Sequence, residues 1–123
     1  MNKDEIIQYN KNVHSFLGYK ETSSDQDFYF VEHPEIKDLR ELNFNRSYIQ
    51  DWNCIMEVVY AIEKQGYLFE IIGNSEKNFA CITVINTDNS VVRTGYYGEI
   101  LTKKEAVVQA INQFLIWYIE NKK

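Results

Sequence analysis

The sequence predicts an α+β fold with the element order α-β-α-β-β-β-α, in which helices sandwich a mainly antiparallel sheet of about four strands. Three observations predict this class. Apolar residues recur at helical spacing near the start, in the middle and at the end of the chain. Three β-rich segments separated by short turns lie between the second and third helical patterns. The 123 residues, 45% hydrophobic and 25% charged, are typical of one globular domain, so we expect a single domain over residues 1–123.

The first helix is expected in DEIIQYNKNVHSFLG, residues 4–18, where Gly18 is suited to the C-terminal cap. Its apolar face comprises Ile6, Tyr9, Val13, Phe16 and Leu17. The polar segment YKETSSDQD is predicted to be a connector. A short strand follows from Phe28 to Glu32 and ends at His33-Pro34. The pattern of residues 35–45 leaves open a helical turn followed by a short extended piece.

The second helix is expected in RSYIQDWNCIMEVVYAIEKQGY, residues 46–67. Two starts compete, because Ser47 with Gln50 fits a capping box and Asp51 is itself a good N-cap. Gly66 ends the helix. At about 100° per residue the apolar side chains form one stripe. We expect all of this stripe to lie in the core: Trp52, Ile55, Met56, Val58, Val59 and Ile62.

The segments YLFEIIG, FACITVI and VVRTGYYGE, joined by the turns NSEKN and NTDNS, predict an antiparallel meander. Residues 79–85 are nearly continuously apolar, which is typical of a strand covered on both faces. We therefore expect helices, or a partner subunit, on each side of the sheet.

Thr102 with Glu105 forms a capping box that opens the last helix. The apolar arc of this helix exceeds half its circumference, whereas a helix that flanks one sheet needs only about 100°. The surplus predicts a homodimer or higher oligomer with this helix in the contact. The candidate contact residues are Ile116, Trp117 and Ile119, with Ile116 expected to be exposed. The alternative is a monomer in which the first helix folds back onto the last.

Composition and motifs argue against several classes of function. The net charge is −5 and no basic run is present, so nucleic-acid binding is not expected. The chain has no phosphate-binding loop, no dinucleotide fingerprint and no C-x-x-C pair, and we expect neither cofactor nor metal. Cys54 and Cys81 lie in apolar runs, where a thiol behaves as a small hydrophobic group. The charged start and the lack of a membrane-spanning apolar window predict no membrane association and a cytoplasmic location.

One aromatic cluster, Gly95-Tyr96-Tyr97-Gly98, is the candidate ligand or partner surface, together with Arg93. Flanking glycines let backbone approach a ligand, and the two tyrosines present rings and hydroxyls. The alternative is a strand end whose tyrosines cap the core, with Arg93 covering a sheet face. His14 and His33 are interpreted as structural or solvated, so no catalytic residue is assigned.

The segments FLGY, SYIQDWNCIMEVVYAIEKQGY and TKKEAVVQAINQFLIWYIENKK together resemble small phage and prophage-associated proteins of unknown function. This group is similar to phage domains described as an ABA sandwich. The middle motif is matched by Trp52, Ile55, Met56, Val58, Val59, Ile62 and Glu63. The last motif is matched by Glu105, Ala106, Val107, Ala110, Phe114, Trp117 and Tyr118. Cys54 departs from the pattern, which has a second tryptophan there.

The resemblance, the acidic composition and the missing catalytic set predict a non-enzymatic accessory protein of a phage or mobile element. Such a protein acts in the host cytosol by binding another protein, for example one that belongs to a host pathway. One alternative is a binder of a nucleotide-like small molecule that uses Arg93, Tyr96 and Tyr97. A second alternative is a small enzyme that depends on a thiol or a carboxylate.

Overall fold

The computed structural model of the chain describes residues 1–24, 29–42, 45–73, 78–85, 91–98 and 102–121. The chain divides into two compact units, Met1–Arg46 and Ser47–Lys123, and each is described by itself. The single domain over residues 1–123 stays a prediction.

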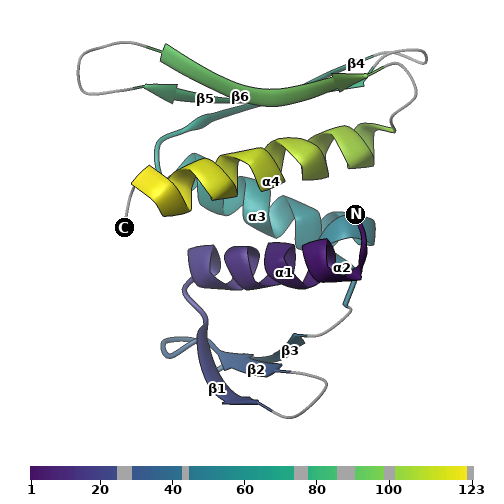
Figure 1. Cartoon of the computed structure of the whole chain (residues 1–123). Helices are drawn as coiled ribbons and strands as arrows, with labels where there is room; N and C mark the ends of the chain where they lie inside the picture. Colours follow the sequence, from purple (N-terminus) through teal and green to yellow (C-terminus); the bar gives the residue numbers. More distant parts are fainter. Residues whose placement is uncertain (25–28, 43–44, 74–77, 86–90, 99–101, 122–123) are drawn as a thin grey trace. The chain divides into compact units, whose positions relative to one another are not determined.

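The first unit contains one helix, α1 (Lys3–Leu17), and three strands among its described residues. The strands β1 (Lys20–Ser24), β2 (Tyr29–Glu32) and β3 (Leu39–Leu42) form an antiparallel sheet in the order β1-β2-β3. Helix α1 lies over this sheet (Figure 1). Tyr19, Val31 and Leu42 form a small buried cluster in this unit, joined by the half-buried Leu17 and Tyr29.

Local signals define the two ends of α1. At its start, the backbone N–H of Glu5 donates to Oδ1 of Asn2 at 2.9 Å, and the Glu5 carboxylate accepts from the backbone N–H of Asn2 at 3.3 Å. At its end, Gly18 takes the left-handed conformation with φ 96°, which confirms the predicted cap. A Cβ atom at Gly18 would lie 3.1 Å from Nε2 of His33, so the close approach of that imidazole also favours glycine.

The second unit begins with two helices in succession, α2 (Ser47–Gln50) and α3 (Trp52–Lys64). Both predicted helix starts are therefore used. Ser47 opens the single turn of α2, and the Asp51 side chain caps α3 by accepting from the Asn53 amide at 2.9 Å. Strands β4 (Leu68–Gly73), β5 (Asn78–Ile85) and β6 (Val91–Gly98) follow as the predicted meander, with β5 in the centre.

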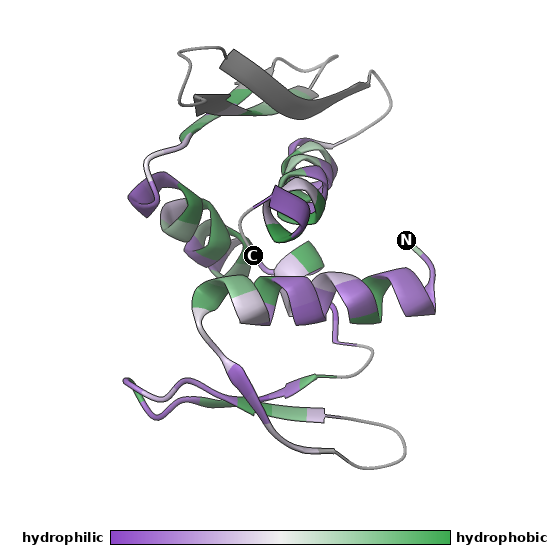
Figure 2. Cartoon of the chain, turned by 60° about the vertical axis from the view of Figure 1, so that its left-hand side comes forward, coloured by the Kyte–Doolittle hydropathy of each residue, from purple (hydrophilic) through white to green (hydrophobic). Residues whose placement is uncertain are grey.

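The last helix, α4 (Lys103–Asn121), begins at the predicted capping box, where the Glu105 amide donates to Oγ1 of Thr102 at 3.1 Å. It packs against β5 and β6 and also contacts α2 and α3. Figures 1 and 2 show α3 and α4 on the same side of the β4–β6 sheet. The wide apolar arc of α4 thus meets both a sheet and neighbouring helices of its own unit. Ile116 is 47% exposed, as predicted.

The α+β class is confirmed, but the strands of the described residues do not form one sheet of about four. They form two three-stranded sheets, and β2 pairs with β1 and β3 rather than with the meander. The predicted order also lacks β1 and β3. Strand β1 lies in KETSS, a polar segment (Figure 2) without the apolar alternation that indicates a strand, and only its pairing with β2 makes it extended.

The predicted core stripe of the second helix is partly wrong. Ile55, Val58 and Ile62 are buried, whereas Trp52 is 39% and Met56 43% exposed. Within its own unit α3 contacts α2, β4 and α4. These contacts leave Trp52 and Met56, at one side of the predicted stripe, exposed.

Trp52→Ala is therefore expected to lower the free energy of unfolding by about 1 kcal/mol, well below the roughly 3–5 kcal/mol typical of a buried aromatic residue. The midpoint of urea unfolding, followed by the fluorescence of the remaining Trp117, measures this. A loss as large as that of a core truncation would show that Trp52 is buried in solution.

Candidate functional site

A line of large exposed side chains runs along α3. Trp52, Met56 and Tyr60 are spaced four residues apart, so they lie one above another on the same side of the helix. Tyr60 is 62% exposed, more than either of the other two. We call these three residues the α3 stripe. Large apolar side chains that gather on a surface, rather than occurring singly, are typical of interaction sites.

Each end of the α3 stripe carries a lysine. Nζ of Lys104, from α4, lies 5.7 Å from the centre of the Trp52 ring and donates to the Gln50 carbonyl at 2.7 Å. Nζ of Lys64 lies 5.4 Å from the centre of the Tyr60 ring. A cation over an aromatic ring restrains both side chains. The stripe is thus an apolar line with positive charge at both ends, in a chain whose net charge is −5.

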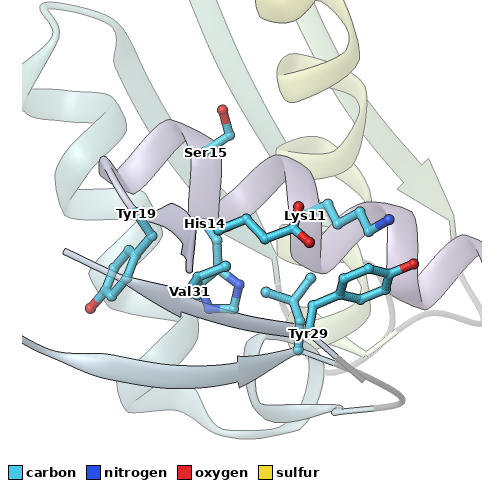
Figure 3. A pocket seen from close by; sticks show the side chains of 8 residues that line it. Lys11, His14, Ser15, Tyr19, Tyr29 and Val31 are labelled. Carbon is cyan, nitrogen blue, oxygen red and sulfur yellow. The ribbon is translucent and has the colours of Figure 1, made fainter. Parts of the chain in front are cut away.

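The first unit has a pocket of about 260 Å³ between α1 and its sheet (Figure 3). Helix α1 contributes Lys11, His14 and Ser15, and Tyr19 follows the helix. The strands contribute Glu21 from β1, Tyr29 and Val31 from β2, and Leu42 from β3. We call this hollow the α1 pocket.

Tyr19 forms one wall of the α1 pocket and is held from several sides. Its hydroxyl donates to Oδ2 of Asp38 at 2.6 Å, and the same oxygen accepts from Nε of Arg40 at 2.8 Å. The Arg40 guanidinium lies over the Tyr19 ring, 4.8 Å from its centre. The rings of His14 and His33 each meet Tyr19 edge-on, with centres 5.3 Å away.

His14 points from α1 towards the strands (Figure 3) and is only 4% exposed. Its burial lowers the pKa of the imidazole to about 4, the positive charge of Arg40 adds to this, and Asp38 opposes it. His14 is therefore neutral at neutral pH and offers one N–H donor and one nitrogen acceptor. The hydrogen bonds from Tyr19 and Arg40 lower the pKa of Asp38, which stays ionised.

The predicted surface of Arg93, Tyr96 and Tyr97 falls on β6. These residues pair with Thr83, Ala80 and Phe79 of β5. The cluster Gly95-Tyr96-Tyr97-Gly98 is thus the end of a strand. Side chains of β6 lie outside the described residues, so a role of this surface in binding stays a prediction.

Sequence reasoning missed Tyr60 and the α1 pocket. Tyr60 could have been found, because its helical spacing from Trp52 and Met56 is visible in the sequence. No local signal marks the pocket, because its lining comes from a helix and three strands spread over residues 11–42.

Comparison with protein-family models, curated proteins and solved structures finds no match for this chain. The resemblance to phage proteins therefore stays a prediction. Within the described residues, no group of His, Cys, Asp or Glu side chains is arranged to hold a metal ion. The described helices include none that is both long and apolar enough to cross a membrane.

Proposed function

We propose that the protein is a non-enzymatic accessory protein that binds another protein through the α3 stripe. The observation that carries this proposal is the alignment of exposed Trp52, Met56 and Tyr60 along one helix. Trp, Tyr and Met are enriched in protein interfaces, and the rigid rings of Trp and Tyr contribute large contact area at low cost in side-chain entropy. An origin in a phage or mobile element is supported by the sequence motifs alone.

The partner that fits the α3 stripe is an amphipathic helix with carboxylates at the margins of its apolar face. Trp52 and Tyr60 are eight positions apart along α3, about 12 Å at 1.5 Å per residue, which matches just over two turns of a packed helix. Carboxylates on the partner would pair with Lys64 and Lys104 at the two ends. A second copy of this chain fits less well, because it brings the same two lysines to the interface.

A display library of helical peptides tests this proposal, with a fixed apolar seam and randomised residues at the margins. Selection on the parent protein is expected to enrich Asp and Glu at the margins. Tyr60→Asp should weaken the binding of the enriched peptides by about tenfold or more, because it replaces the most exposed ring of the apolar line with a charge. Lys64→Glu should weaken the binding of acidic peptides and leave the binding of neutral peptides unchanged.

Ile116→Asp is the matched control, since Ile116 is also an exposed apolar residue on a helix of the second unit. It should leave peptide binding unchanged. Peptides that bind the parent and Tyr60→Asp equally would refute the α3 stripe as the binding surface. Light scattering tests whether a second copy of the chain occupies the α3 stripe instead. A mass of twice 14.6 kDa for the parent that falls to 14.6 kDa for Tyr60→Asp would assign the stripe to a second copy.

The homo-oligomer through Ile116, Trp117 and Ile119 remains a separate proposal. Ile116 is exposed and Trp117 and Ile119 are half-buried, which leaves part of this surface accessible. The ring of Trp117 is 6.2 Å from that of Tyr67 within its own unit, so part of its contact area is already used. The cytoplasmic location also stays a prediction.

A further inference from the structure

We propose that the α1 pocket binds a small zwitterion: an amino-acid-like molecule whose apolar or aromatic side chain enters the pocket while its ammonium and carboxylate groups stay at the mouth. This inference does not rest on the proposed function, since the α3 stripe belongs to the second unit. It rests on three features of the pocket: its interior, its charged residues and the restraint of its walls.

The interior favours an uncharged group. Val31 and Leu42 are buried apolar residues, and the rings of Tyr19 and Tyr29 provide aromatic surface. His14 adds a neutral imidazole among them. A charged group placed here would lose its hydration without meeting an opposite charge, whereas an apolar or aromatic side chain would gain contact area.

The charged residues of the lining have opposite sign. Among the described lining residues only Lys11 and Glu21 carry a full charge at neutral pH, and both are exposed. A simple anion would be attracted by Lys11 and repelled by Glu21, and a simple cation would meet the reverse. A ligand that carries both charges satisfies both residues, with its carboxylate near Lys11 and its ammonium near Glu21.

The walls are restrained before a ligand arrives. Hydrogen bonding to Asp38 and the rings of His14 and His33 fix the orientation of Tyr19. Nζ of Lys11 lies 4.2 Å from the centre of the Tyr29 ring, which restrains Lys11 beside the mouth while leaving ammonium protons for a carboxylate. Little side-chain entropy is then lost on binding. This raises the affinity that a pocket of about 260 Å³ can reach for a small ligand.

NMR titration of the full chain with L-phenylalanine and L-leucine at up to about 10 mM tests the proposal, because even millimolar affinity is detected at that concentration. Shifts are expected at Val31 and Leu42. N-acetyl-phenylalanine, which lacks the ammonium charge, and phenylalanine amide, which lacks the carboxylate, should each bind about tenfold more weakly.

Charge exchange at the mouth provides the sharper test. Lys11→Glu and Glu21→Lys should each lower the affinity for phenylalanine about tenfold. The double variant should recover most of this affinity because it restores one charge of each sign. Lys3→Glu, at an exposed lysine that does not line the pocket, is the control and should bind like the parent.

Three results would overturn the proposal: no shift with either phenylalanine or leucine at about 10 mM, equal binding of phenylalanine to the Lys11→Glu variant and the parent, or equal binding of phenylalanine and its acetylated analogue. The last result would make the ligand a simple anion. Far-UV circular dichroism confirms that each variant is folded. Should the single variants unfold, Tyr29→Leu replaces them. This substitution keeps an apolar wall but removes the ring, so it should lower the affinity for phenylalanine more than the affinity for leucine.

Discussion

Phe114→Ala is expected to lower the free energy of unfolding of the second unit by about 3–5 kcal/mol, the usual cost of a buried aromatic truncation. The Phe114 side chain is 0% exposed and lies in the middle of α4. Its ring meets Tyr67 edge-on with centres 5.0 Å apart, and the rings of Trp117 and Tyr118 are 5.9 Å and 5.7 Å away. Alanine would remove these contacts and leave a cavity that the surrounding rings fill only partly.

Urea unfolding followed by tryptophan fluorescence measures this loss specifically, because both tryptophans of the chain, Trp52 and Trp117, belong to the second unit. Ile116→Ala provides the control on the same helix. Ile116 is exposed, so its truncation should change the free energy of unfolding by no more than about 1 kcal/mol. Equal midpoints for the two variants would show that α4 does not bury Phe114 in solution.

Lowering the pH from neutral to below 4 is expected to cost the first unit about 3 kcal/mol of stability through His14 alone. The pKa of His14 is about 4 in the folded protein and 6.5 when the residue is free. Between these values the unfolded chain binds a proton that the folded chain does not. Stability is therefore complete above pH 6.5 and falls as the pH drops from 6.5 to 4.

Asp38, which interacts with His14, adds to the loss of stability in acid through its own titration. Arg40 disfavours the imidazolium and Asp38 favours it, but burial dominates both. The pKa of Asp38 is itself lowered, by the hydrogen bonds from Tyr19 and Arg40. A carboxyl group with a lowered pKa stabilises the folded state at neutral pH, and that contribution is lost in acid as well.

Unfolding of the first unit can be followed through the NMR methyl signals of Val13 and Val31 in urea at pH 7.5 and about pH 4.5. His14→Gln cannot titrate, so its loss of stability between the two pH values should be smaller than that of the parent by about 2–3 kcal/mol. The comparison uses the difference between two pH values, so it holds even if the variant is less stable at neutral pH. Equal losses in parent and variant would show that His14 is not the titrating group.

Predictions from the sequence are most accurate where a local pattern contains the whole signal. The ends of α1, α3 and α4 follow from Gly18, Asp51 and Thr102, because each acts on backbone groups within a few residues of itself. The meander of β4, β5 and β6 follows from β-rich segments separated by short turns. These interactions are local, so the sequence alone determines them.

Only the tertiary structure decides which strands share a sheet and which faces remain exposed. Residues 20–24 become a strand by pairing with β2, and no pattern of their own predicts it. The sequence identifies the apolar side chains of α3 but not which of them the neighbouring elements cover. In the structure Trp52 and Met56 remain exposed. The α1 pocket likewise exists only when residues as far apart as Lys11 and Leu42 are brought together. Such features depend on contacts between distant residues, which helical periodicity and turn chemistry do not specify.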